Sequence, residues 1–202
     1  MGRRPKPVIG IAGGIGAGKT AVAKILAALG CVVAHSDEAA RAALEDPEIR
    51  ETLLKWWGEA ILDPAGRIDR SKLGRLVFAS PEDRRRLEAL THPWIEARRR
   101  AQFAAAPPEA PALVIDAPLL FEAGLDAACD AVIFVDAPRP LRLHRVRETR
   151  GWSEAELRRR EESQLPLDVK RSGADHVIRN DGDLSRLEAR IRTTLRSIVT
   201  SR

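Results

Sequence analysis

Four residues near the N-terminus have the types and the spacing of a phosphate-binding loop. The pattern GxxxxGK(S/T) is matched in full by Gly13, Gly18, Lys19 and Thr20. Glycines let backbone N–H groups turn inward toward phosphate oxygens, and the lysine ammonium reaches the β- and γ-phosphates. The threonine hydroxyl takes a coordination position of Mg²⁺. The predicted ATP-binding residues of this loop are Gly14, Ile15, Gly16, Ala17, Gly18, Lys19, Thr20 and Ala21.

The setting of the loop argues against a chance glycine-rich turn. The strand-like run 8–12 precedes it, and the apolar spacing over 21–29 predicts a helix after it, with Gly30 as a left-handed C-terminal cap. A strand, a glycine loop and a helix in this order are the context in which the motif binds phosphate. Lys19 is therefore also a predicted catalytic residue, because its charge faces the transferring phosphoryl group.

Asp37 has the position of a general base. It follows the second predicted strand, 31–34, by three residues, at the edge of a parallel sheet where ligands of open α/β folds gather. A carboxylate there can accept the proton of a substrate hydroxyl as that hydroxyl attacks the γ-phosphate. The alternative is an N-cap for a helix starting at Glu38, and spacing alone leaves both interpretations open.

Asp116 is the predicted metal-binding carboxylate, together with the Thr20 hydroxyl. It ends the apolar strand 112–116 and can hold Mg²⁺ directly or through water. Asp136 competes for this role, because it ends the strand 131–136. Asp116 is favoured because the segment 118–122, Pro-Leu-Leu-Phe-Glu, is too apolar for an ordinary surface loop. Core packing is the alternative for its apolar residues, and we expect it to hold for at least one of them.

A cluster of arginines follows the fourth predicted strand. These residues are Arg142, Arg145, Arg147 and Arg150, on a helix that leaves the carboxyl edge of the sheet. A mobile flap could bring a guanidinium onto the transferring phosphoryl group, and Arg142 and Arg145 are one turn apart. For any one of them taken singly, a solvated helix face is the favoured interpretation. Separately, His92-Pro93 is predicted to start a helix, with Pro93 in its first position.

The remaining patterns define the fold class. Short strands are also expected at 131–136 and 176–178, and helices at 139–162 with a break near Gly151 and at 184–199. Between 37 and about 105 the pattern is almost wholly helical. Strands that alternate with helices predict an α/β protein with a parallel sheet flanked by helices, as in P-loop NTPases. The helical stretch is then an all-helical insertion.

Composition narrows the function classes. The chain has 202 residues, which suits one compact α/β domain with an inserted segment. A net charge of +5 fits either a nucleic-acid binder or an enzyme with polyanionic ligands. The second is favoured, with no nucleic-acid partner, because no nucleic-acid motif accompanies the charge and only 4% of residues are aromatic. Two widely separated cysteines, no signal segment and no apolar membrane span predict a cytoplasmic protein.

Taken together, these segments resemble the dephospho-CoA kinase family. The segments that carry the resemblance are 9–20, Ser36-Asp37, Ala40-Arg41, Ile68-Asp69-Arg70, Leu73, Val77-Phe78, Leu87-Glu88, His92-Pro93, 116–122, Gln164, Ala174-Asp175 and Asn180. The glycine loop occurs in proteins of many functions. The combination of His-Pro before a long helix with Pro-Leu-Leu-Phe-Glu is specific to this family. The resemblance implies transfer of the γ-phosphate of ATP to the ribose 3′-hydroxyl of dephospho-CoA, with Mg²⁺.

The resemblance also assigns roles to residues and segments. Asp37 falls on the family's proposed base, and Arg145 on a lid arginine that meets the ATP phosphates, so both are expected to be catalytic. The substrate-binding residues are expected to be Asp37, His92, Pro118, Leu119, Leu120 and Glu122. The sheet core is expected at 7–36, 112–138 and 174–202, the CoA-facing helical segment at 37–106 and the lid at 139–173. A monomer or weak homo-oligomer is expected.

The chain departs from the family pattern at four places. Ala12 stands where threonine is usual, and Ala21 follows Thr20 where the family has Ser-Thr after the lysine. His35 replaces a frequent second aspartate, so Asp37 must act without that neighbour. Thr149 stands where a second lid arginine is common, and Arg147 or Arg150 is the candidate substitute.

A phosphate-binding loop also fits two other functions, another small-molecule P-loop kinase and a regulatory NTPase. A GTPase would need an Asn-Lys-x-Asp base reader, and the run Asn180-Asp181-Gly182-Asp183 lacks the lysine. An ABC-type ATPase would need its signature loop, which is absent from the sequence. Dephospho-CoA kinase is therefore the predicted activity.

Overall fold

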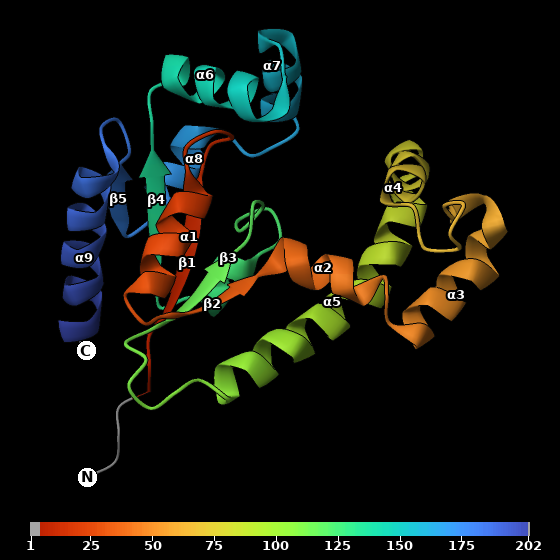
Figure 1. Cartoon of the computed structure of the whole chain (residues 1–202), viewed down its shortest axis with the longest axis horizontal. Coiled ribbons are helices and arrows are strands. Elements are labelled where there is room, and N and C mark those ends of the chain that lie inside the picture. The colour runs from red at the N-terminus through yellow and green to blue at the C-terminus, as the bar shows by residue number, and fades with distance from the viewer. Residues whose placement is uncertain (1–4, 202) are drawn as a thin grey trace. The chain divides into compact units, whose positions relative to one another are not determined.

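Five short apolar runs form one parallel sheet in the computed structural model, which describes residues 5–201 (Figure 1). The strands are β1 (Val8–Gly13), β2 (Val32–His35), β3 (Leu113–Asp116), β4 (Ala131–Asp136) and β5 (His176–Arg179). Their order across the sheet is β2-β3-β1-β4-β5, and every neighbouring pair is parallel. β1 and β4 are buried along almost their whole length, as strands covered on both faces by helices must be.

The helices that accompany the sheet are α1 (Lys19–Ala28), α6 (Arg139–Arg150), α7 (Glu154–Glu162), α8 (Leu167–Ser172) and α9 (Leu184–Thr200), with the short 3₁₀ helix η2 (Leu125–Ala128). α1 and α9 pack on the sheet, whereas α6 and α7 lie beyond the carboxyl ends of its strands (Figure 1). Helical spacing of apolar residues puts one stripe of α1 and one of α9 into the main core. Gly30 has φ +88° directly after α1, which confirms the predicted left-handed cap.

The chain divides into two compact units. The first contains the sheet and its helices, up to His35 and from Ala105 onward, and the second covers Ser36–Ala104. The expected lid segment 139–173 consists of α6, α7 and α8 and belongs to the first unit. Within residues 5–201, no helix has both the length and the apolar character needed to cross a bilayer.

The second unit is helical, as the sequence predicts. It contains α2 (Ser36–Ala43), α3 (Pro47–Trp57), the 3₁₀ helix η1 (Gly58–Ile61), α4 (Arg70–Ala79) and α5 (Pro81–Ala104). One isolated antiparallel bridge joins Leu62 to Ile68. Aspartates cap two of the helices: Asp46 accepts hydrogen bonds from two backbone N–H groups of α3, and Asp69 does the same for α4. The unit has its own core, built around Ala43, Ile49, Leu53, Ile61 and Leu73.

The prediction that a helix starts at Pro93 is wrong. α5 begins at Pro81, where Ser80 Oγ accepts a hydrogen bond from Asp83 N, and it runs through Pro93 without a break. A proline inside a helix loses one backbone hydrogen bond. The helix continues because its apolar side chains keep their helical spacing on both sides of Pro93, and Leu90 and Trp94 both pack on the core of the second unit.

Candidate active site

The loop from Gly14 to Gly18 joins β1 to α1 at the carboxyl edge of the sheet, as predicted. Gly16 and Gly18 have φ angles of +76° and +95°, which side-chain-bearing residues rarely adopt. Both positions are also crowded. A Cβ atom on Gly16 would lie 2.6 Å from the Arg142 carbonyl oxygen, and one on Gly18 would lie 2.2 Å from Asn180 Nδ2. These two glycines are therefore fixed by backbone conformation and by space.

Lys19 folds back over this loop. Its ammonium group donates hydrogen bonds to the carbonyl oxygens of Gly13 (2.8 Å) and Gly14 (3.0 Å). Burial is the main reason that the pKa of Lys19 falls from its ordinary value to about 8, and the positive charge of Lys170 lowers it further. The negative charge of Asp116 acts in the opposite direction. The ammonium therefore lies where it can pair with a bound polyphosphate. When no anion is present, its buried surroundings disfavour the charged form.

Arg145 contacts the loop through backbone carbonyls. Its guanidinium donates to Ala17 O (3.2 Å) and to the backbone and side-chain oxygens of Asn180 (3.3 Å each). Asn180 is buried at the end of β5, and its Nδ2 donates to Ala17 O at 2.7 Å. Burial holds the pKa of Arg145 below its ordinary value. The structure therefore brings Arg145 to the phosphate loop, and its contact with ATP phosphates stays a prediction.

Arg142 overturns the expectation that each arginine of this helix, taken singly, is solvated. Only 5% of it is exposed, and its guanidinium donates to Ile15 O at 3.2 Å and pairs with Glu161 of α7. Its Nε is buried with no hydrogen-bond partner among residues 5–201. Sequence reasoning missed this burial because it depends on how α6 packs against the loop, which the periodicity of α6 does not reveal.

The two candidates for the missing second lid arginine differ in their surroundings. Arg150 lies over the ring of Trp152, with 4.7 Å from its guanidinium carbon to the ring centroid, and its charge contributes to the low pKa of Lys19. Arg147 instead acts electrostatically on Glu154. Arg150 is therefore the candidate whose charge reaches the loop lysine. Thr149 itself donates its hydroxyl to Arg145 O at 2.7 Å.

Asp116 and His35 form a pair at the ends of adjacent strands. The register of β2 and β3 places them opposite each other, and His35 Nδ1 lies 2.9 Å from Asp116 Oδ2. Asp116 is mostly buried, with 16% of its side chain exposed. Asp136, its rival for the metal role, pairs instead with Arg171 at 3.5 Å. The sequence identified His35 only as a departure from the family pattern, because the partnership depends on strand pairing.

The structure contradicts the alternative in which Asp37 is a helix cap. α2 begins at Ser36, so Asp37 is in the first turn of the helix instead of at its N-cap. Its side chain is exposed and makes no hydrogen bond or ion pair within the part of the chain described. A carboxylate without a structural partner fits a group that acts on a ligand, and the role of general base stays a prediction.

The segment 118–122 contributes both core and surface. Leu120 is 1% exposed and packs beside Gly10, where an added Cβ would lie 2.7 Å from it, whereas Leu119 is 39% exposed. Leu119 is therefore the leucine of this segment that is open to a ligand, and Pro118 precedes it in the same exposed turn. The expectation that at least one apolar residue of the segment belongs to the core is confirmed by Leu120.

Glu122 closes this segment with an internal ion pair. It binds the buried Lys170 of α8 at 2.6 Å and accepts a hydrogen bond from Leu165 N at 3.0 Å. Burial is the largest single influence and would raise the pKa of Glu122, but the hydrogen bond and charge of Lys170 together with backbone hydrogen bonds outweigh it, and the pKa is lowered. Lys170 also donates to Gln164 at 3.0 Å. No signal in the sequence marks Lys170, because its partner lies 48 residues earlier. His92, another predicted substrate contact, is exposed on α5.

The residues predicted to hold a magnesium ion suit that ion. The Thr20 side chain is exposed and has no hydrogen-bond partner in residues 5–201, and Asp116 uses only one carboxylate oxygen for His35. Residues 5–201 contain no cluster of three or more His, Cys, Asp or Glu side chains able to enclose a metal. Mg²⁺ commonly takes one or two protein oxygens and completes its shell with phosphates and water. Thr20 and Asp116 together supply two such protein oxygens.

The fold and the loop define the class of protein. A parallel sheet with a complete GxxxxGKT loop after its central strand, and the arginine-bearing helix α6 against that loop, is the architecture of a P-loop kinase.

Comparison with known proteins specifies the family. The family model described as dephospho-CoA kinase matches residues 7–186. A dephospho-CoA kinase of Anaeromyxobacter dehalogenans is 42% identical over 178 residues, covering 87% of this chain and 84% of its own. The crystal structure of TT1252 from Thermus thermophilus superposes with a TM-score of 0.85 at 36% identity, covering 96% and 98% of the two chains. Dephospho-CoA kinase from Campylobacter jejuni has a TM-score of 0.70 at 26% identity, covering 97% and 98%. The chain belongs to the dephospho-CoA kinase family.

Proposed function

We propose that this chain is an ATP-dependent dephospho-CoA kinase. It transfers the γ-phosphate of ATP to the ribose 3′-hydroxyl of dephospho-CoA and produces CoA and ADP, the final step of coenzyme A biosynthesis. Family membership over residues 7–186 supports this proposal. The structural observation that carries it is the loop lysine, whose ammonium lies over the carbonyls of Gly13 and Gly14 with the charge of Asp116 nearby.

Each predicted residue has one task in this reaction. The 3′-oxygen attacks the γ-phosphorus, its proton passes to the Asp37 carboxylate, and the bond from the γ-phosphorus to the leaving oxygen of ADP breaks. Lys19 releases the loop carbonyls and pairs with the β- and γ-phosphates. Thr20 and Asp116 would hold Mg²⁺, which when bound neutralises charge on the phosphate oxygens. Arg145, from the adjacent helix α6, supplies a further positive charge.

The substrate contacts belong to the same proposal. His92, Pro118 and Leu119 have exposed side chains that can meet dephospho-CoA. Leu120 and Glu122 support the segment from the core side, through packing and the Lys170 ion pair. We also propose a cytoplasmic enzyme that acts as a monomer or weak homo-oligomer. Neither of its two cysteines, Cys31 and Cys129, forms a disulfide, which suits a reducing compartment.

Coupled measurement of ADP release tests the proposal. Purified protein would be supplied with Mg·ATP and, separately, dephospho-CoA, AMP, CMP or shikimate. We expect turnover with dephospho-CoA far above that with the other acceptors, and the product should carry its new phosphate on the 3′-oxygen. Turnover confined to another acceptor would show a different kinase on the same fold. Hydrolysis of ATP unaffected by every acceptor would favour a regulatory NTPase.

A further inference from the structure

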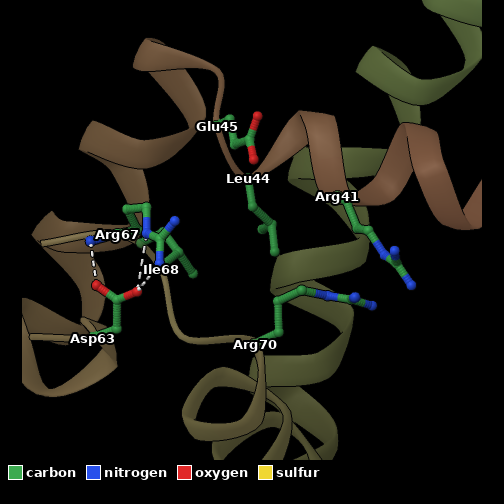
Figure 2. A pocket seen from close by; sticks show the side chains of 7 residues that line it. All are labelled: Arg41, Leu44, Glu45, Asp63, Arg67, Ile68 and Arg70. Atoms are coloured by element: carbon green, nitrogen blue, oxygen red, sulfur yellow. Dashed lines mark hydrogen bonds and ion pairs between the residues drawn. The ribbon is translucent and has the colours of Figure 1, made fainter. Parts of the chain in front are cut away.

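The second unit contains a pocket whose lining residues have no role in the phosphoryl transfer described above. It has a volume of about 280 Å³ and lies among the end of α2, the turn before α4 and the start of α4 (Figure 2). Its lining residues are Arg41, Leu44, Glu45, Asp63, Arg67, Ile68 and Arg70. Leu44 and Ile68 also pack on the core of the second unit, so they give the pocket an apolar floor. Its rim carries charged side chains.

Two of the three arginines in this pocket have no partner in the part of the chain that the structure describes. Arg67 pairs with Asp63 at 3.1 Å. By contrast, Arg41 and Arg70 make neither a hydrogen bond nor an ion pair with any residue from 5 to 201. Figure 2 shows both guanidinium groups extending to the same side of the pocket, with Glu45 on the opposite side of Leu44. Two adjacent unpaired guanidinium groups repel each other and together attract a dianion.

Neighbouring cations that lie outside the pocket show that acceptors are available in this region. Arg50 donates to Gly66 O at 2.9 Å, and Lys72 donates to Leu62 O at 2.6 Å. Arg41 is four residues after Asp37 on the same helix, a spacing at which acid and base often pair, yet no ion pair joins them. Arg41 and Arg70 therefore line the pocket with guanidinium groups that have no acceptor among residues 5–201.

The helix α2 relates this pocket to the predicted base. Asp37 and Arg41 lie on one face of α2, and four residues of helix advance by about 6 Å. In an adenosine 5′-diphosphate group, one ribose ring separates the 3′-hydroxyl from the 5′-phosphates. A substrate whose 3′-hydroxyl reaches Asp37 therefore has its diphosphate about one helical turn away. Leu44, three residues beyond Arg41, then lies near the part of the substrate that follows the diphosphate, which in dephospho-CoA is the pantetheine arm.

From these observations we infer that Arg41 and Arg70 bind the diphosphate of the acceptor substrate, with Leu44 and Ile68 beneath the start of its pantetheine arm. The inference rests on the proposed function, because it takes dephospho-CoA as the acceptor. It assigns the pocket to the acceptor and leaves the phosphates of ATP to the glycine loop. The contact explains how an adenosine with a long 5′ substituent is distinguished from free adenosine.

Steady-state kinetics on single and double variants test the inference. Arg41→Gln and Arg70→Gln should each raise the KM for dephospho-CoA about tenfold, because each removes hydrogen bonds to a charged group, and the double variant should raise it further. The kcat and the KM for ATP should stay within about twofold of the wild-type values. The inhibition constant of adenosine against dephospho-CoA should not change, because adenosine lacks the diphosphate. Arg75→Gln, on the exposed side of α4, is the charge-matched control and should leave every constant unchanged.

Several results would overturn the inference. One is a double variant with a wild-type KM for dephospho-CoA, and another is equal weakening of adenosine and dephospho-CoA. If the wild-type protein fails to phosphorylate dephospho-CoA, the proposed function is wrong and the pocket is tested separately. Binding of inorganic pyrophosphate, measured by calorimetry with Mg·ADP saturating the glycine loop, should then be lost in the double variant and kept in Arg75→Gln. Equal binding of pyrophosphate by both variants, or no binding by the wild-type protein, would refute the assignment of this pocket to a diphosphate group.

Discussion

Binding of ATP should take up a proton at Lys19 in weakly alkaline solution. The pKa of this lysine is lowered to about 8, chiefly by burial. A bound triphosphate supplies the negative charge that the site lacks and should return the pKa toward the ordinary value of about 10.4. The fraction of neutral lysine in the free protein then sets the uptake, which should be about 0.1 proton per ATP at pH 7, 0.5 at pH 8 and 0.9 at pH 9.

The same shift predicts how ATP affinity depends on pH. About one pH unit or more below this pKa the ammonium is already present, so Lys19 should contribute almost no pH dependence to the affinity. Above pH 8 the apparent Kd should rise toward a tenfold increase per pH unit, until the pKa of the bound state is reached. The Kd rises with pH because the pKa of Lys19 is lower in the free protein than in the complex. Above pH 8 the free protein has lost the proton that the complex needs.

Calorimetry in buffers with different ionisation enthalpies measures this uptake directly. Titrations between pH 8 and 9.5 avoid protonation of ATP itself. Lys19→Arg is the matched control, because a guanidinium stays charged throughout this range and should show no uptake. Lys19→Ala should lose on the order of a hundredfold or more in turnover, because the transition state loses a charge. Wild-type uptake near zero at pH 9, or equal uptake in the Lys19→Arg protein, would refute the reasoning.

Three further predictions follow from single side chains. Asp37→Asn should lower kcat while leaving ATP affinity almost intact, and normal turnover of this variant in the coupled assay would exclude a general base at this position. Gly18→Ala should lower the free energy of unfolding by at least about 1–2 kcal/mol, because φ is +95° and the new methyl group would meet Asn180; denaturant titration checks this. In the folded protein the Cys31 thiol should react with Ellman's reagent far more slowly than the Cys129 thiol, because burial raises its pKa to about 11, and equal rates would contradict the burial.

The local elements of this fold could be predicted from the sequence with small errors at their ends. The strand predicted at 131–136 has the same bounds as β4, and the closing helix differs from α9 by one residue. Hydrophobic periodicity and helix caps are short-range properties, so a stretch of sequence contains them completely. One exception is α5, where a proline in the sequence suggested a boundary that side-chain packing around Trp94 overrides, and another is the short helix α8, which was not predicted from the sequence.

The candidate site could be predicted only in part. The glycine loop is a contiguous motif, so its position after β1 and before α1 followed from spacing. The partners of its residues did not. Asn180 approaches Ala17 from 163 residues away, and Lys170 binds Glu122 across 48 residues. Such pairs depend on which strands are neighbours in the sheet, and the strand order cannot be predicted from any single segment of the sequence.

The sequence by itself determined that this chain has a phosphate-binding loop on a parallel α/β sheet, because both depend on residue types at short, fixed spacings. Only the tertiary structure decided which charges surround that loop. It buried Arg142 and paired His35 with Asp116, and it left Arg41 and Arg70 beside one pocket without partners among residues 5–201. Electrostatic energies vary with distance and burial, and folding alone brings residues distant in sequence to within a few ångströms of each other.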